Sequence, residues 1–453
     1  DLGCYGNTEI RTPHLDRLAR QGLRLTDCYS ASPVCSPSRA GLLTGRTPNR
    51  LGIYDWIPEK SGIYLRPEEI TIAHLLRKAG YRTCHVGKWH LNSRMDGGEP
   101  TPGDAGFEHW LATQNNAHPS HLNPDNFLRN GTPVGRLEGA SAHLLVDEAV
   151  RWLDTVREEP FFLNVWFHEP HEPVEAEERY LALYADEANA DRGHYYADVT
   201  QMDAAVGRLL DCLDEHGLGR TTFVFFSSDN GPETLRRYPS ANRSHGSPGP
   251  LRGRKLHMTE GGYRVPGIIR WPGRVPPGSE SAEPVCSLDL LPTFCAMAGV
   301  EPPGDRALDG ASLLPLLEGR TIPRTQPLYW QYDFAISNSW KISLRDGPWK
   351  LLANGALDTW RLYKIDDDPS ELHDRSEKEH TATNRLEEAL KRLHEEIRAE
   401  GARSGNPPPH RRENRRSRPQ RRGNECFSAV AAGYGRAGWR SCFISPTTSL
   451  YSG

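Results

Sequence analysis

The middle of the chain alternates between two hydrophobic periods, which predicts helices and strands in turn. Three segments carry apolar residues at helical spacing: 72–79, 144–156 and 199–213. Three others have the length and composition of short buried strands: 81–86, 161–167 and 221–226. Strands of this kind between helices indicate a central sheet covered on both faces, and therefore an α/β fold.

Each predicted strand is followed closely by reactive side chains. The pairs, in chain order, are Lys88 and His90, His168 and His171, and Asp229 and Asn230. Ligands of open α/β sheets bind at the carboxyl ends of the strands, so we expect the three pairs to converge. A polar loop that holds a histidine by chance would explain one such pair, but three together favour a site.

The pattern changes after Arg324. Short strand-like pieces and one amphipathic helix follow, at 328–330, 341–344, 349–353, 361–365 and 386–397. They predict a small antiparallel sheet with a covering helix. Between Arg403 and Arg422 lie eight Arg and one acidic residue, a composition typical of disorder. The predicted units are therefore a large domain at 1–324, a small α+β subdomain at 325–402 and a disordered tail at 403–453.

Composition narrows the class of protein. The chain has 453 residues, with 55 basic and 59 acidic side chains and a formal net charge of −4. This balance disfavours a nucleic-acid-binding protein. The nine Cys include no C-x-x-C pair, so neither a disulfide scaffold nor a Cys-rich zinc site is expected. No apolar run reaches the roughly 18 residues of a membrane-spanning helix. A globular enzyme is the expected class.

The segment 32–45 combines a candidate nucleophile with an anion-binding turn. Pro37 suits the first position of a helix, which would place Cys35 just before the helix start. Free N–H groups and the helix dipole attract anions at that end. Arg39 adds a permanent cation that can reach back over the same turn. From the spacing alone, a buried structural cysteine explains Cys35 equally well.

The same segment carries a family signature. Cys35-Ser36-Pro37-Ser38-Arg39 resembles the C-x-P-x-R motif of type I sulfatases. Further blocks of the family's pattern occur in the expected order, at 1–7, 12–16, 87–91, 168–173, 228–231, 251–255 and 260–266. The resemblance implies an alkaline-phosphatase-like α/β sandwich with a large mixed central sheet flanked by helices, plus the smaller C-terminal antiparallel sheet.

The resemblance also implies an activity and a nucleophile. The expected reaction is hydrolysis of a sulfate monoester, with a sulfated glycan or an aryl sulfate as substrate. A separate maturation enzyme oxidises Cys35 to formylglycine, and the hydrated aldehyde attacks sulfur. Arg39, Lys88 and Lys255 supply the positive charge that an anionic sulfate requires, with Arg39 mainly holding the formylglycine.

Proton transfer is assigned by the same resemblance to two histidines. His171 protonates the leaving oxygen, and His90 takes a proton from the remaining hydroxyl of residue 35. His168 is the alternative to His171, because each precedes a Glu-Pro pair.

A divalent ion, usually Ca²⁺ in this family with Mg²⁺ as the alternative, completes the expected site. Asp229 and the side-chain carbonyl of Asn230 are hard oxygen ligands, which suit either ion better than zinc. The hydrated residue 35 is the third expected contact. The Asp-Asp pair that the family carries on its first strand is not found, and Asp1 resembles a later, non-ligand position. We therefore expect an N-terminally truncated chain that binds metal poorly.

Two other interpretations stay open. Relatives that cleave phosphonates or phosphate diesters share C-x-P-x-R, and a truncated chain could bind a sulfated glycan without catalysis. Comparing the turnover of an aryl sulfate with that of an aryl phosphodiester distinguishes a sulfatase from a phosphodiester hydrolase. Conversion of residue 35 to formylglycine, together with metal binding, distinguishes an enzyme from a chain that only binds glycan. The resemblance further implies export to the periplasm or the extracellular space. The charge balance predicts no nucleic-acid partner, and the lack of a long apolar run predicts no membrane span.

Overall fold

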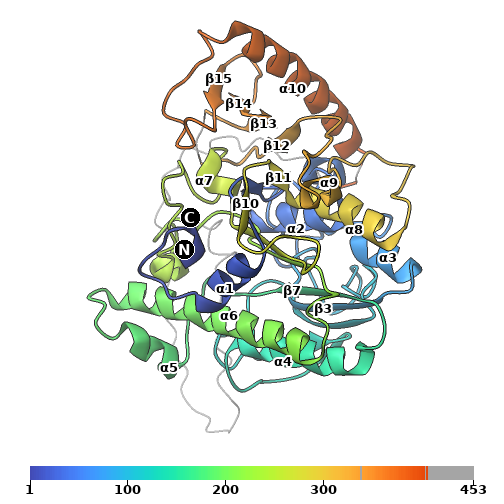
Figure 1. Cartoon of the computed structure of the whole chain (residues 1–453), viewed down its shortest axis with the longest axis vertical. Helices are drawn as coiled ribbons and strands as arrows, with labels where there is room; N and C mark the ends of the chain where they lie inside the picture. The colour runs from blue at the N-terminus through green and yellow to red at the C-terminus, as the bar shows by residue number, and fades with distance from the viewer. Residues whose placement is uncertain (337–338, 404, 407–453) are drawn as a thin grey trace, which may run out of the picture.

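Two mixed sheets form the central layer of the larger, N-terminal part of the protein (Figure 1). The structure is a computed structural model that describes residues 1–336, 339–403 and 405–406. The first sheet has the strand order β6 (Thr132–Pro133), β5 (Leu128–Arg129), β4 (His109–Thr113), β3 (Arg82–Lys88), β7 (Phe161–Trp166). Its strands β4, β3 and β7 are parallel, which confirms the predicted repetition of strand and helix.

The second sheet contains the strand that ends at the predicted metal loop. Its order is β10 (Ser279–Ser281), β1 (Leu23–Leu25), β9 (Gly267–Arg270), β8 (Val224–Ser227). Strand β8 pairs with β9 antiparallel, and β1 pairs with β10 parallel. A short parallel ribbon joins β2 (Cys28–Tyr29) to β11 (Val285–Cys286). The mixed central sheet of the predicted α/β fold is thus present, divided between these sheets.

Helices cover both faces of this layer (Figure 1). One group is α1 (Pro13–Gln21), α4 (Ser141–Val156) and α6 (Ala190–Glu215), and the other is α2 (Cys35–Thr44), α3 (Ile72–Lys78) and α8 (Leu290–Ala298). Cys84 and Val86 of β3 pack against Leu145 and Ala149 of α4. Helix α6 begins before the predicted segment 199–213, because Asn189 caps an additional, mostly polar start.

The remaining helical elements are short and connect these layers: η1 (Gly3–Tyr5), η2 (Pro48–Leu51), α5 (Glu178–Leu181), η3 (Ala182–Tyr184), η4 (Pro239–Arg243), α7 (Glu260–Tyr263), η5 (Ser287–Asp289) and α9 (Leu314–Leu317). Within the described residues, no helix is both long enough and apolar enough to span a membrane. The predicted disordered tail lies outside the described residues, apart from Arg403, Gly405 and Asn406.

A cavity of about 1040 Å³ lies between the edges of the two sheets. Strands β7 and β8 are each the last strand of their sheet in the described part of the chain, and both line this cavity. Side chains such as Phe162, Val165 and Phe225 are therefore half-buried, whereas the sequence predicts fully covered strands. The prediction is wrong here because an apolar run does not reveal whether a strand has a neighbour on each edge.

The C-terminal part confirms the predicted small sheet and covering helix. Its antiparallel order is β12 (Leu328–Gln331), β13 (Ile342–Asp346), β14 (Trp349–Ala353), β15 (Trp360–Lys364), and α10 (His380–Gly401) lies across it. Apolar residues at helical spacing on α10 pack on one face of the sheet: Leu386, Leu390, Leu393 and Ile397. The α/β class with a smaller C-terminal sheet is thus confirmed.

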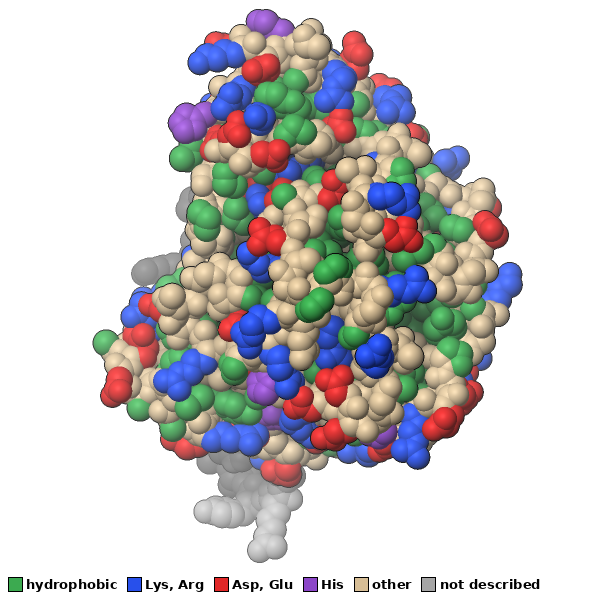
Figure 2. All heavy atoms as spheres, in the orientation of Figure 1, with side chains coloured by type: hydrophobic (Ala, Val, Ile, Leu, Met, Phe, Trp, Pro, Cys, Tyr) green, Lys and Arg blue, Asp and Glu red, His purple; other side chains and the backbone are tan. Residues whose placement is uncertain are grey.

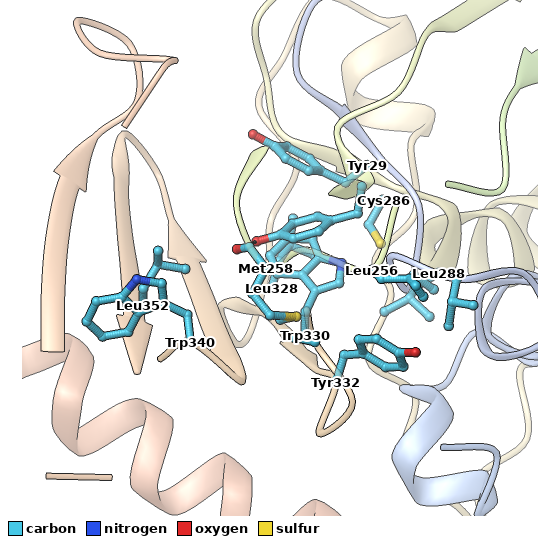
Figure 3. Packing of buried hydrophobic residues seen from close by; sticks show 14 of the residues in the cluster. Tyr29, Leu256, Met258, Cys286, Leu288, Leu328, Trp330, Tyr332, Trp340 and Leu352 are labelled. Atoms are coloured by element: carbon cyan, nitrogen blue, oxygen red, sulfur yellow. Dashed lines mark hydrogen bonds between the residues drawn. The ribbon is translucent and has the colours of Figure 1, made fainter. Parts of the chain in front are cut away.

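The other face of the C-terminal sheet packs on the N-terminal part, beneath the start of α2 (Figure 3). Trp330 lies at the centre of this contact and stacks near Tyr29 and Tyr263, with ring centroids 5.3 and 4.8 Å away. Its indole Nε1 donates a hydrogen bond to the carbonyl oxygen of Ser30 at 2.8 Å. Cys35 belongs to the same buried cluster. The small sheet therefore supports the segment that carries the candidate nucleophile.

We expect Trp330→Ala to lower the free energy of unfolding by about 3–5 kcal/mol, because it removes a large buried ring and leaves a cavity. The shift is measured by urea denaturation followed by circular dichroism. Leu372→Ala is the control, because Leu372 is 70% exposed, and its effect should stay within about 0.5 kcal/mol. A separate early transition of the C-terminal part, with the main transition unchanged, would contradict this view of the interface.

Candidate active site

Cys35 lies at the amino-terminal end of α2 and is buried. It is the first residue of the helix, with Val34 as the N-cap, whereas the sequence places it just before a helix that starts at Pro37. The helix begins earlier because Val34 accepts the first helical hydrogen bond, from the N–H of Ser38. The dipole argument is unchanged, since Cys35 still occupies the positive end.

Lys88 is the last residue of β3 and is almost completely buried. Its Nζ donates to Oδ1 of Asn116 at 3.3 Å. Burial, which disfavours the charged form, lowers the pKa of Lys88 to about 8, and the Arg39 charge acts in the same direction. Gly87 precedes it at φ +109°, and a Cβ there would stand 1.9 Å from the carbonyl oxygen of Trp166. Only glycine lets β3 approach β7 so closely just before this lysine.

His90 follows two residues later and points into the protein interior. Its φ of +58° is uncommon for a residue other than glycine. Nε2 lies 3.1 Å from the carbonyl oxygen of Ile57, and Nδ1 has no hydrogen-bond partner. Burial and the charge of Lys88 hold the pKa of His90 well below its usual range, so the imidazole is neutral and has one free nitrogen.

The structure distinguishes the two histidines that the sequence leaves as alternatives. His171 Nε2 lies 3.2 Å from Nζ of Lys255, so the second lysine motif reaches this histidine. His168 is buried, and its Nε2 lies 2.8 Å from Oγ1 of Thr113. Burial, then the charges of Lys88 and Lys255, keep the pKa of His171 well below its usual value. His171 is therefore the histidine in contact with the second cation.

Two glutamates lie next to Lys255 and His171, and neither was predicted as a site residue from the sequence. Glu233 Oε2 lies 3.3 Å from Nζ of Lys255, and Lys255 together with Arg237 lowers the pKa of Glu233 to about 2 against the effect of burial. Nδ1 of His171 lies 3.1 Å from both the carbonyl oxygen and Oε2 of Glu172, but only the carbonyl oxygen is in hydrogen-bond geometry. The Glu172 carboxylate is instead held by the hydroxyl of Tyr238.

Arg39 binds the predicted metal loop. Its Nε and Nη2 donate to Oδ2 of Asp229 at 2.9 and 2.7 Å, and Nη1 donates to the carbonyl oxygen of Lys88 at 3.0 Å. The guanidinium also stacks over the ring of Trp166, 4.6 Å from its centroid. The resemblance assigns Arg39 mainly to the modified residue 35, whereas its hydrogen bonds here join β3 to Asp229.

The metal loop offers oxygen atoms that fit a hard cation. Asn230 Oδ1 is buried and has no hydrogen-bond partner, which leaves it available as a ligand. Burial would raise the pKa of Asp229, but Arg39, Lys88 and Lys255 lower it, so the carboxylate stays ionised. The two oxygens of Asp1 accept from the Tyr195 hydroxyl at 2.8 Å and the Ser247 N–H at 2.9 Å. Asp1 therefore already has donors for both oxygens.

The predicted residues converge. Residues from all three predicted pairs and the two other cations line the cavity between the sheets: Arg39, Lys88, His168, His171, Asp229, Asn230 and Lys255. Cys35 lies close enough that a negative charge on it raises the pKa of both Lys88 and Lys255, against the lowering effect of burial. Asn116, Glu172, Glu233 and Tyr238 were missed because single polar residues in loops carry no spacing signal.

Two family models match the chain. One described as "Sulfatase" matches residues 1–300, and one described as "N-sulphoglucosamine sulphohydrolase, C-terminal" matches residues 254–400.

Known proteins resemble the chain over most of its length. The steryl-sulfatase of Mus musculus is 36% identical over 403 residues, covering 70% of this chain and 63% of that protein. The N-acetylgalactosamine-6-sulfatase of Homo sapiens is 37% identical over 360 residues, covering 73% of this chain and 65% of that protein. The chain thus spans less than two thirds of these relatives. The solved structure of Ps i-CgsB in complex with k-i-k-neocarrahexaose has a TM-score of 0.79 at 28% identity, covering 89% of this chain and 90% of that chain.

We expect binding of inorganic sulfate to weaken as the pH rises through about 8, because Lys88 then loses its positive charge. The decline should reach at most about tenfold per pH unit and is measured by isothermal titration calorimetry between pH 7 and 9. Lys88→Met should bind sulfate more weakly and without this slope. Lys378→Met, which changes an exposed lysine, is the control. A slope that persists in Lys88→Met would show that another group titrates.

Proposed function

Because the chain belongs to the sulfatase family, we propose that it hydrolyses a sulfate monoester, with residue 35 as a formylglycine nucleophile. One observation carries the proposal. Cys35, at the positive end of α2, is close enough to Lys88 and Lys255 for a negative charge on it to raise the pKa of both, and Lys255 contacts His171. A nucleophile, two cations and a proton donor thus meet at one place. An anionic sulfur centre repels nucleophiles, so reaction requires this concentration of positive charge.

The first half-reaction transfers the sulfuryl group to residue 35. One hydroxyl of the hydrated formylglycine attacks sulfur and releases its proton to solvent water. The sulfur–oxygen bond to the alcohol breaks, and the leaving oxygen takes a proton from protonated His171. In the structure burial, together with the charges of Lys88 and Lys255, holds the pKa of His171 well below its usual value and keeps it neutral. A bound sulfate offsets these positive charges and favours the protonated form that donates. We assign His168 no proton transfer, because Thr113 and burial hold it in place.

The second half-reaction releases sulfate. His90 takes the proton of the remaining hydroxyl of residue 35, the carbon–oxygen bond to sulfate breaks, and the aldehyde forms again. Water then rehydrates it. His90 suits this role because it is neutral and its Nδ1 is free to accept a proton. Oxidation of Cys35 to formylglycine by a separate enzyme is part of the proposal.

Asp229 and Asn230 are the residues that would hold a divalent cation, for which Ca²⁺ is our first choice and Mg²⁺ the second. The buried, unpartnered Oδ1 of Asn230 supports this assignment. When bound, such an ion supplies positive charge to the sulfate oxygens and to the oxygens of residue 35. The residues described here contribute one formal negative charge from this loop, and Arg39 already shares it.

A sulfated sugar is the substrate class that we propose. Ps i-CgsB was solved with a bound oligosaccharide, and one relative acts on an N-acetylgalactosamine-6-sulfate group by its name. Basic and acidic side chains are interspersed on the face shown in Figure 2. We assign recognition of the sulfate group to the buried cations Arg39, Lys88 and Lys255. The test is release of sulfate from sulfated-sugar and aryl sulfate panels, with an aryl phosphodiester for comparison. Faster turnover of the phosphodiester would overturn the proposal. The exported location stays a prediction.

We expect Cys35→Ala to abolish sulfate release and Cys35→Ser to leave at most one turnover. Serine keeps a hydroxyl but forms no hydrate, so it cannot expel sulfate by returning to an aldehyde. Release is measured under multiple-turnover conditions, and mass spectrometry checks the oxidation of residue 35. Cys295→Ser, a buried cysteine on α8, is the control that should stay active. Many turnovers by Cys35→Ser would disprove the formylglycine mechanism.

We expect residues 1–453 to bind Ca²⁺ only weakly, with a Kd of about 1 mM or higher, because affinity depends on the number of charged ligands. The affinity is measured by calorimetric titration of the oxidised protein. Asp229→Asn should remove the binding that remains. A micromolar Kd would show that another carboxylate, such as Asp1, completes the site.

A further inference from the structure

A second cluster of potential ligands lies deeper in the protein than the site described above. His121 comes from the loop between β4 and β5, Asp198 from α6, and Glu169 from the loop after β7. All three are buried, and His121 and Asp198 have no exposed side-chain surface. One ligand atom from each lies within 4.8 Å of the other two. None of the three belongs to the proposed hydrolytic machinery or to the Asp229 loop.

In each of the three side chains, one polar atom has a hydrogen-bond partner and the other has none. His121 Nδ1 lies 3.0 Å from Asp198 Oδ1. Glu169 Oε1 accepts from the Ser141 hydroxyl at 2.6 Å and the Ala142 N–H at 2.9 Å. His121 Nε2, Asp198 Oδ2 and Glu169 Oε2 are buried without any hydrogen-bond partner. Buried polar atoms nearly always have partners. The unpartnered oxygens of Asp198 and Glu169, in a cluster whose ligand atoms lie within 4.8 Å of one another, therefore indicate an additional bound species.

The charge of the cluster indicates that this species is a cation. Asp198 and Glu169 form no ion pair with a lysine or arginine among the described residues, and the only charged partner of Asp198 is His121. A divalent ion beside a neutral His121 balances two carboxylates completely. A single proton on His121 balances only one of them, and the charge of the other is then met only by the Ser141 hydroxyl and the Ala142 N–H at the start of α4.

We propose that His121, Asp198 and Glu169 form a second metal site, for a Zn²⁺-type divalent ion. One imidazole and two carboxylates suit zinc, whereas Ca²⁺ and Mg²⁺ favour sites made of oxygen alone. Three protein ligands leave a fourth position for water. Glu169 lines the large cavity, which gives the ion a route of entry.

The location gives the ion a structural role. Glu169 lies between His168 and His171, while Asp198 is on α6 and His121 is in the loop between β4 and β5. An ion held by all three ties the histidine loop to both segments. In its absence a proton is the competitor: burial would lower the pKa of His121, but Asp198 and Glu169 raise it to about 9.

The experiment uses the full chain, freed of metal by chelation and then titrated with Zn²⁺ in the presence of excess Ca²⁺. We expect one equivalent to bind and to raise the melting temperature. Asp198→Asn should weaken this binding at least 100-fold. Asp229→Asn changes the other site and should leave Zn²⁺ binding unchanged, and His373→Ala controls for surface binding, because the His373 side chain is 76% exposed.

X-ray absorption at the zinc edge makes the test independent of how the variants fold. The expected spectrum shows nitrogen and oxygen ligands at about 2.0–2.1 Å, including one imidazole. A spectrum without imidazole, or equal Zn²⁺ binding by the parent and Asp198→Asn, would overturn the proposal. Failure of the parent to bind Zn²⁺ would also overturn it and would show that the cluster is a protonated histidine–carboxylate group only.

Discussion

The burial of positive charge is the constraint on which this structure depends. Arg39, Lys88 and Lys255 are all nearly inaccessible to solvent, and isolated cations are unfavourable in such a place. The protein compensates two of them with carboxylates, Asp229 for Arg39 and Glu233 for Lys255. Among the described residues, the amide oxygen of Asn116 is the only hydrogen-bond partner of Lys88 Nζ. Its charge is therefore the one that an incoming anion would satisfy.

The fold provides this compensation by bringing strand ends together. Lys88 ends β3, Asp229 follows β8, and the histidine loop follows β7. These strands belong to two sheets, and the bonds of Arg39 to Asp229 and to the carbonyl oxygen of Lys88 connect them. Arg39 itself extends from α2, one turn after Cys35. A single guanidinium thus fixes the position of the helix that begins at Cys35 relative to both sheets, and its stacking on Trp166 adds a third contact.

Much of this arrangement could be predicted from the sequence, for identifiable reasons. Periodicity located α3, α4, β3 and β7 to within a few residues because their apolar positions face a packed core. Convergence of the three reactive pairs followed from the direction of the strands alone. The half-burial of β7 and β8 could not be predicted, because exposure of a strand depends on neighbours that its own residues do not encode.

Side-chain partners were the other limit. The contact of His171 with Lys255, which lies 84 residues further along the chain, has no local signal in the sequence. The bond of Arg39 to Asp229 joins residues 190 positions apart, and no local pattern reveals it. Glu233 and Tyr238 were missed for the same reason.

The contact around Trp330 bears on how separable the two parts of this chain are. The change of pattern after Arg324 predicts a domain boundary there. The match to one family model, however, runs from residue 254 to 400 and includes Lys255. Trp330 bonds to Ser30, five residues before Cys35, while Lys350 bonds to Glu260 at 2.7 Å, five residues after Lys255. The small sheet is therefore not an interchangeable module. If the small sheet were exchanged between relatives, the segments around residues 29 and 260 would have to be exchanged with it. The two sides of this interface are therefore expected to change together during evolution.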